Sequence, residues 1–337
     1  VGGGEFLQPT VDDNTGGILA GGTQVRGYRL VTVGGAPAPL DVFLSSQGFP
    51  IPPITTEAGN NIGSNFNNFG IPGAKSFDLT TPGYAGANPY YARIASAPAA
   101  TVLQDAIAKD PTFFTLSEIG GNDVLGYATT GGNGSEVITD PGTFTMALNA
   151  LVDGLTSNGA KGAIGNVPNI TSLSFFTTVA YNPVPLNAPT ADALNQGYAQ
   201  YNGGLLLAQS NNLIDAAEVA ERTIIFTASA TNAVIIEDEY LTDLSGLGLP
   251  NYRQATADDL VLLTAGGLIP AGGGTSSPLG DTFVLTPEEQ DEIATATNAY
   301  NAAISNVASS NDLALVDLNS VLEEAANNGI MFDSYTA

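Results

Sequence analysis

Residues 112–123 read TFFTLSEIGGND, and this stretch decides how the rest of the sequence is interpreted. The run 112–116 is built from Thr, Phe and Leu, a composition typical of a buried strand. It is followed by Gly120, Gly121, Asn122 and Asp123, residue types that favour turns. The segment therefore predicts a strand that leads into a loop. Because ligands bind beyond the carboxyl ends of parallel strands, this loop is a candidate functional site.

Segments with helical and strand-like patterns alternate on both sides of this strand. Capping residues followed by proline mark two helix starts, at Asp140-Pro141 and at Thr286-Pro287, the second with Glu289 completing a capping box. This alternation predicts an α/β fold: a three-layer α/β/α, flavodoxin-like parallel sheet with long loops. The expected helices cover 98–109, 140–155, 189–208, 286–307 and 318–325, and the expected strands cover 65–69, 112–116, 163–167 and 313–316.

Two regions depart from this pattern. Residues 1–62 are rich in Gly, Pro, Asn and Thr, and predict a loop-rich N-terminal segment with a hairpin near 28–33. Residues 63–337 form the predicted α/β domain. Within it, 223–281 alternate short apolar strands, at 223–227 and 233–236, with Gly-rich loops. We interpret this part as an insertion.

Charge and composition exclude several classes of function. The chain has 33 acidic and 8 basic residues, a formal charge of −25, which would repel nucleic acid and anionic lipid. It contains no Cys and no His, which excludes disulfides, Cys nucleophiles and thiolate or imidazole metal sites. We expect no cofactor and no metal, since only a hard cation held by oxygen ligands would remain possible.

The sequence predicts no membrane span, because the longest apolar-leaning stretch, 260–269, is far shorter than the roughly 20 residues a bilayer requires. Both ends are expected to be cut, since the chain lacks an initiator Met, an export signal and capped terminal elements. Abundant Gly, Asn and Thr with few Lys and no Cys favours an exported bacterial protein, periplasmic, secreted or lipoprotein. An acidic cytoplasmic protein from a salty habitat would have a similar composition.

Two motifs follow predicted strands and contain groups that suit catalysis. In the G-x-N-D string at 120–123, the amide of Asn122 can donate hydrogen bonds to a developing oxyanion without titrating. In the segment 68–74, NFGIPGA, Gly73 allows a substrate to approach a backbone N–H. Ordinary turns would use the same residues, so each motif alone also has a structural interpretation.

Together and in this order, the two motifs resemble the SGNH/GDSL hydrolase family. Gly73 resembles the second conserved block, and Gly120-x-Asn122-Asp123 resembles the G-x-N-D third block. Segments 232–241 and 251–264 resemble extra regions of large bacterial lipoprotein-like members. The resemblance implies a serine acyl-enzyme mechanism acting on small-molecule, glycan or lipid esters. Gly73 and Asn122 would form the oxyanion hole, and Gly120 and Asp123 would support the loop.

The departures from the family pattern are equally informative. No Gly-Asp-Ser block, which carries the family's nucleophile, precedes Gly73, and Gly63-Ser64 lacks the acidic partner. The Asp-x-x-His block that supplies the base is missing, since the chain has no His. We therefore expect this chain to be inactive by itself and the full-length protein to be an esterase. The alternative is a non-catalytic protein that binds a glycan or peptide on a decayed hydrolase fold.

Other candidate sites are less specific. The segment 246–250, GLGLP, lacks the third glycine and the helix of a dinucleotide-binding motif. The acidic runs 12–14 and 237–239 could hold Ca²⁺, but neither has a complete ligand loop, so solvated acidic faces are the preferred interpretation. Paired carboxylates for glycoside hydrolysis stay open, although no spacing selects a pair.

The resemblance also makes a geometric prediction. The amide nitrogen of Gly73 and the side chain of Asn122 should lie at the same end of adjacent parallel strands and face one crevice. If they share one oxyanion, they should lie within roughly 10 Å of each other.

Overall fold

The computed structural model describes residues 5–33, 36–332 and 335–336. The chain folds as a mixed α/β protein that divides into two compact units, each built from three segments. The first unit contains Val1–Asn122, Asp140–Asn166 and Tyr300–Asp317, and the second contains Asp123–Thr139, Val167–Ala299 and Leu318–Ala337.

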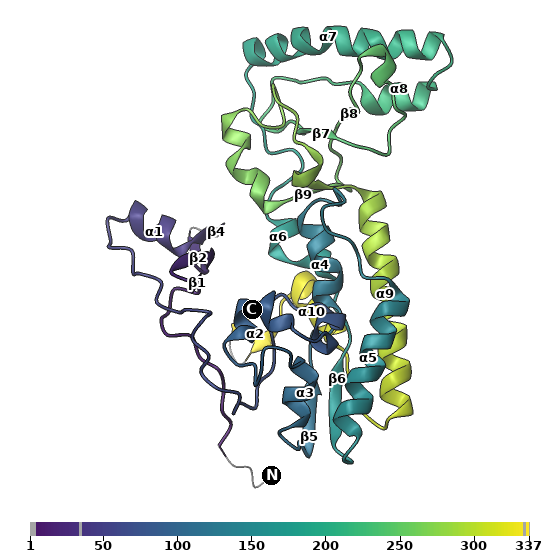
Figure 1. The fold of residues 1–337 in the computed structure, drawn as a ribbon. Helices are drawn as coiled ribbons and strands as arrows, with labels where there is room; N and C mark the ends of the chain where they lie inside the picture. The colour runs from purple at the N-terminus through teal and green to yellow at the C-terminus, as the bar shows by residue number, and fades with distance from the viewer. Residues whose placement is uncertain (1–4, 34–35, 333–334, 337) are drawn as a thin grey trace. The chain divides into compact units, whose positions relative to one another are not determined.

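Ten α-helices lie within the described residues and are labelled in Figure 1 where space allows. They are α1 Leu40–Ser46, α2 Pro89–Ala92, α3 Val102–Ile107, α4 Gly121–Thr129, α5 Pro141–Thr156, α6 Ser174–Thr177, α7 Ala188–Ser210, α8 Ala216–Arg222, α9 Pro287–Ser310 and α10 Leu318–Asn328.

The strands are short, and most form two-stranded antiparallel pairs. They are β1 Ile18–Ala20, β2 Thr23–Arg26, β3 Leu30–Val33, β4 Ala36–Pro39, β5 Phe113–Leu116, β6 Lys161–Gly165, β7 Ile235–Glu237, β8 Tyr252–Gln254, β9 Leu260–Val261, β10 Val284–Leu285, β11 Ala314–Val316, β12 Met331–Phe332 and β13 Tyr335–Thr336.

A parallel sheet of three strands, in the order β11-β6-β5, organises the first unit. The central strand β6 aligns Ile164 with Leu116 of β5 and with Leu315 of β11. The carboxyl ends of all three strands therefore meet at one edge of the sheet. The predicted strands at 112–116, 163–167 and 313–316 are confirmed to within two residues at each end.

Helix α5 follows the predicted pattern closely. The Asp140 carboxylate accepts hydrogen bonds from the amides of Gly142 and Thr143, and Pro141 opens the first turn. Its apolar stripe is buried, and the Phe144 ring stacks on Tyr300 of α9 with centroids 4.2 Å apart. Figure 1 shows α5 and the C-terminal half of α9 running side by side. This packing forms much of the core of the first unit.

Among the described residues of the second unit lie two apolar clusters and two buried arginines. Arg222, fully buried, donates hydrogen bonds to the Thr242 and Pro250 carbonyls and forms an ion pair with Glu218. Arg253 is held between the carboxylates of Asp238 and Asp259, both buried. Buried charges of this kind are tolerated only when they are fully paired.

Three expected elements differ from the structure. No strand forms over 65–69, because the Asn67 and Asn68 side chains accept hydrogen bonds from the amides of Leu7 and Gly70 and the segment stays irregular. The helix expected over 98–109 begins only at Val102, because Thr101 caps it by accepting from the Gln104 amide.

The strand expected over 223–227 is also absent, because side chains of helix α7 take its backbone hydrogen bonds. Asn195 of α7 both donates to the carbonyl and accepts from the amide of Phe226. Asn202, two turns later, does the same with Ile224. Helix side chains thus take the hydrogen bonds that a neighbouring strand would otherwise supply. The expected strand at 233–236 corresponds to β7, shifted to Ile235–Glu237.

None of the helices in the described part of the chain is both long and apolar enough to cross a membrane.

The long helix α9 offers a test of the packing. Ile293, Tyr300, Ile304 and Val307 are buried as predicted. Removing the Ile304 side chain from the core loses about 1.5–3 kcal/mol of apolar burial, and an aspartate there also places a charge in the core. Ile304→Asp should therefore abolish soluble folding.

The matched control is Ser305→Asp, at the exposed neighbouring position. It should leave expression and the circular dichroism spectrum unchanged. Soluble, cooperatively folding Ile304→Asp protein would contradict the observed burial.

Candidate functional site

The segment 71–74 forms a tight turn whose sequence explains its shape. The Ala74 amide donates to the Ile71 carbonyl at 3.1 Å. Pro72 and Gly73 occupy the two central positions, and Gly73 has a φ of +78°. Proline followed by a residue with positive φ is the signature of a type II turn. Glycine is favoured at this position because an L side chain is strained there.

Two asparagine amides hold this turn from outside. The Asn88 side chain donates to the Pro72 carbonyl at 3.0 Å, and the Asn122 side chain donates to the Ala74 carbonyl at 2.9 Å. Asn122 lies in the first turn of α4, directly after the loop that follows β5. The structure thus brings together Gly73 and Asn122, which are distant in sequence. The strand expected before Gly73 is absent, so that part of the geometric prediction is wrong.

The turn presents hydrogen-bond donors that the described part of the protein leaves available. A primary amide has two N–H donors, and Asn122 uses one on Ala74. No described residue accepts the second, and none accepts the backbone N–H of exposed Gly73. The Arg26 Nη2 atom lies 3.9 Å from the position that a Cβ on Gly73 would occupy. These groups favour an anionic oxygen as the ligand.

The loop between β5 and α4 has a strained backbone. Gly120 is buried with a φ of +101°, and the Gly121 amide donates to the Glu118 carbonyl. Glu118 itself has a φ of +58°, whereas the other described non-glycine residues with positive φ are Asp or Asn. Glutamate seldom adopts this conformation, and strained backbone is concentrated at functional sites.

Asp123, the last residue of the G-x-N-D string, is buried within the second unit, where its carbonyl accepts a hydrogen bond from the Thr139 amide. The string is therefore not an open surface turn. Its four residues comprise the end of the strained loop and the start of α4.

The turn at 71–74 packs against an aromatic cluster through Ile71. Ile71 is buried with Tyr84, Tyr91 and Ile94, and Phe69 packs against them. The Tyr91 hydroxyl donates to the buried carboxylate of Asp105 at 2.8 Å. The turn is therefore anchored to a packed core, as a preorganised binding site requires.

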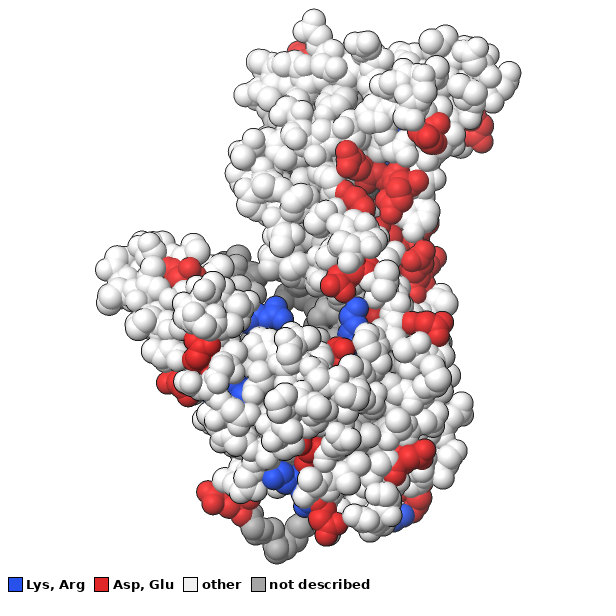
Figure 2. Space-filling view, viewed as in Figure 1, with Lys and Arg blue, Asp and Glu red and all other residues white. Residues whose placement is uncertain are grey.

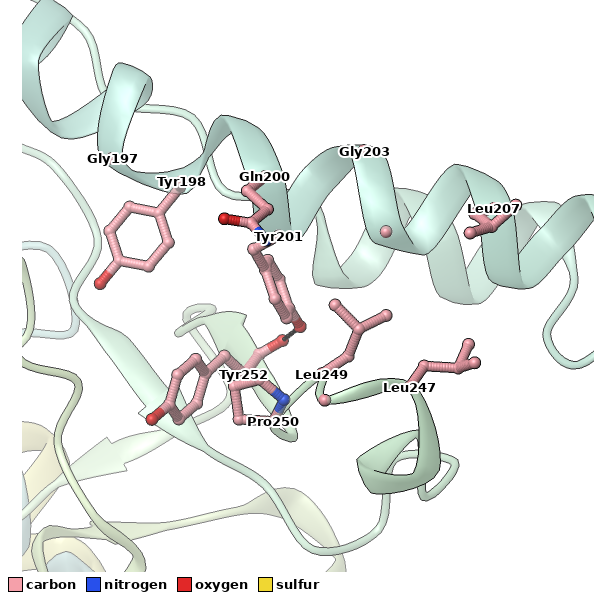
Figure 3. Close-up of a pocket in the computed structure, with 12 residues that line it drawn as sticks. Gly197, Tyr198, Gln200, Tyr201, Gly203, Leu207, Leu247, Leu249, Pro250 and Tyr252 are labelled. Atoms are coloured by element: carbon pink, nitrogen blue, oxygen red, sulfur yellow. Dashed lines mark hydrogen bonds between the residues drawn. The ribbon is translucent and has the colours of Figure 1, made fainter.

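A separate groove of about 640 Å³ lies in the second unit, between α7 and residues 247–252. Figure 3 shows Tyr198 and Tyr201 projecting from α7 toward the segment that carries Leu249 and Tyr252. The Tyr198 and Tyr201 hydroxyls donate to the Thr275 and Tyr252 carbonyls. These two hydroxyls are therefore engaged in the fold, and the groove combines aromatic and leucine side chains with Gln200 and several glycines. Four residues of the 246–250 segment, Leu247 to Pro250, line this groove.

The two acidic runs are not simply solvated faces. The Asp13 carboxylate accepts hydrogen bonds from the amides of Thr15, Thr55 and Thr56 and so ties two loops together. Asp238 is buried against Arg253. The prediction that these runs are solvated acidic faces is therefore wrong for Asp13 and Asp238. The sequence could not show this, because each carboxylate binds partners that are far away in the sequence.

Sequence reasoning missed Arg26 and Asn88. Arg26 lies near Gly73, 47 positions away, and Asn88 donates a hydrogen bond to Pro72, 16 positions away. No local pattern marks either residue. Comparison of the chain with protein-family models, curated proteins and solved structures found no match.

The backbone at Gly73 can be tested directly. A Cβ would meet no atom closer than 3.9 Å, so Gly73→Ala isolates the effect of the positive φ. We expect a loss of about 1–2 kcal/mol in the free energy of unfolding, measured by urea denaturation.

Gly86→Ala serves as the comparison, because Gly86 is exposed, has no positive φ and has open space around it. It should change the free energy of unfolding by less than about 0.5 kcal/mol. Equal effects of the two substitutions would argue against a strained turn at Gly73.

Proposed function

We propose that this chain is the central part of an SGNH/GDSL-type carboxylic ester hydrolase. The backbone N–H of Gly73 and the side-chain amide of Asn122 would bind the oxyanion. The observation that supports the proposal is the Asn122 hydrogen bond to the carbonyl of Ala74, the residue after Gly73, because it leaves the second amide N–H of Asn122 without an acceptor among the described residues. Two neutral, fixed donors next to one another are the arrangement that stabilises a tetrahedral acyl intermediate.

The fold proposed with this function is a three-layer, flavodoxin-like α/β/α domain. In support, the three described strands of the main sheet are all parallel, and β5 and β11 each lead into a helix. The candidate donor Asn122 lies beyond the carboxyl end of β5, the edge at which α/β proteins bind their ligands.

The reaction requires a serine nucleophile and a histidine base. This chain has no His and no recognisable Gly-Asp-Ser block. A serine hydroxyl would attack the ester carbonyl carbon while an imidazole takes the hydroxyl proton, and the carbonyl electron pair would move to the oxyanion. Collapse of this intermediate would expel the alcohol, protonated by the imidazolium, and water would then hydrolyse the acyl-enzyme. Since the chain has no His, we propose that a longer native chain supplies the serine and histidine blocks.

The proposed substrates are esters of acylated carbohydrates or lipids, and the proposed location is outside the bacterial cytoplasm. A net charge of −25 would favour neutral over anionic substrates. The donors would tolerate many alcohols, because they contact only the carbonyl oxygen.

The alternative function is non-catalytic binding of a glycan or peptide on a decayed hydrolase fold. One observation favours it: the groove beside α7 has aromatic walls at Tyr198, Tyr201 and Tyr252 and contains no carboxylate, thiol or imidazole. Aromatic walls bind sugar rings and apolar side chains without performing chemistry.

The functions are distinguished by comparing the 337-residue chain with the full native gene product on a panel of aryl esters. We expect turnover from the native protein only, because a hydroxyl without a base is a weak nucleophile. In the native protein, Asn122→Ala should lower kcat by about 10²–10³-fold, the usual effect of losing one oxyanion donor. Circular dichroism would verify that the variant folds.

Asn149→Ala provides the control, because Asn149 is an exposed asparagine whose amide donates only to the Thr145 carbonyl of its own helix. It should leave kcat unchanged. Strong ester hydrolysis by the short chain would overturn the proposed division of the catalytic residues. A native protein that folds, contains both blocks and hydrolyses no ester would favour the binding function.

A further inference from the structure

Three carboxylates from separate parts of the second unit meet at the start of α9. Glu239, Asp281 and Glu289 each place one carboxylate oxygen within 4.8 Å of those of the other two. Glu239 is exposed, Asp281 is half-buried and Glu289 is fully buried, so the group leads from the surface into the interior. Figure 2 shows Asp and Glu side chains gathered in this region, where α9 begins.

The buried end of this carboxylate group has an unsatisfied acceptor. Glu289 is 0% exposed, and its Oε2 atom accepts hydrogen bonds from the amide and hydroxyl of Thr286 at 2.6 and 2.9 Å. None of the described residues donates to Oε1, although this atom is buried. A buried carboxylate oxygen without a donor is costly and calls for a ligand.

Neither of the two cationic side chains of the second unit is free to neutralise the group. Arg222 and Arg253 are the only Lys or Arg residues in the second unit. Both are buried, and they are engaged with Glu218 and with Asp238 and Asp259. Charge compensation must therefore come from protons or from a bound cation.

The crowding of negative charge is reflected in the acidities. Burial, followed by the charges of Glu239, Glu237 and Asp238, raises the pKa of Asp281 to about 7. Burial also raises the pKa of Glu289, and Glu239 and Asp281 add to this effect although the Thr286 hydrogen bonds oppose it.

A glycine pair packs tightly against the group. A Cβ on Gly131 would lie 2.1 Å from the Asp281 carbonyl oxygen, and one on Gly132 would lie 2.0 Å from Glu289 Oε1. Both glycines have positive φ. The backbone of this loop therefore approaches Glu289 Oε1 more closely than a residue with a side chain could.

We propose that Glu239, Asp281 and Glu289 form a binding site for one Ca²⁺ ion. Oxygen atoms bound to one Ca²⁺ at 2.3–2.6 Å are at most about 5 Å apart, and these three carboxylate oxygens lie within that limit. Ca²⁺ accepts six to eight oxygen ligands in irregular geometry, so carbonyls and water can complete the shell. Mg²⁺ fits less well, because it demands an octahedron and keeps most of its water.

The Ca²⁺ proposal can be tested independently of ester hydrolysis, because the experiments measure ion binding and thermal stability. The 337-residue chain, treated with EDTA and dialysed, would be titrated with CaCl₂ by calorimetry. We expect one Ca²⁺ per chain and a rise in Tm of about 4–8 °C at 10 mM CaCl₂. Tb³⁺ would serve as an optical probe. The chain contains no Trp, so sensitised emission would report a tyrosine near the ion, and Tyr240 is adjacent to Glu239.

Matched substitutions test the ligands. Glu289→Gln and Asp281→Asn preserve shape and remove one charge each, and either should weaken Ca²⁺ binding at least about tenfold. Glu288→Gln, at the exposed neighbouring position, should bind as the unmodified chain does. Should Glu289→Gln fail to fold, the exposed ligand Glu239 provides a third variant, Glu239→Gln, with the same expectation.

Three results would overturn the Ca²⁺ proposal. The first is a chain whose Tm does not change with CaCl₂ and whose tyrosines do not sensitise Tb³⁺ emission. This result would mean that protons alone neutralise the three carboxylates, and a higher Tm of Glu289→Gln would support that conclusion. The second is Ca²⁺ binding that is equally strong in Glu288→Gln, Asp281→Asn and Glu239→Gln, which would mean diffuse binding to the acidic surface. A response to MgCl₂ at equal or lower concentration would reject Ca²⁺ as the preferred ion.

Discussion

The first unit depends on the pairing of β6 with a strand on each side. Lys161–Gly165 aligns with β5 and β11 in parallel register, and this alignment brings the carboxyl ends of all three to one edge. The contact is possible because β6 has a glycine at Gly162, where a Cβ would lie 2.6 Å from the Phe114 ring. The loop that contains Gly120 and the start of α4 then emerge at that edge, where Asn122 reaches the turn at Gly73.

Asparagine side chains form hydrogen bonds with backbone N–H and C=O groups that a neighbouring strand would otherwise satisfy. Asn88 and Asn122 hold the turn at Gly73, while Asn195 and Asn202 satisfy the backbone of Phe226 and Ile224. An amide offers both donors and an acceptor and carries no charge, so it can substitute for a neighbouring strand in the interior. This substitution explains why residues 223–227 form no strand.

The strongly acidic composition has different consequences in different places. Where an arginine is available, carboxylates are buried as ion pairs, as around Arg253. At Glu239, Asp281 and Glu289 no arginine is available, and a buried oxygen lacks a donor. The same residue types thus stabilise the fold at one position and create a potential ligand site at another, and the distribution of eight cations decides which.

The sequence by itself determined the local features: the helix starts at Asp140 and Thr286, the buried stripe of α9, the positions of the three sheet strands, and the absence of His and Cys. Such features depend on residues within a few positions of one another. Only the tertiary structure decided that Asn122 meets Ala74, that 223–227 pairs with a helix, and that Glu239, Asp281 and Glu289 converge. These contacts join residues that are far apart in sequence, and their distances are determined by how whole elements pack.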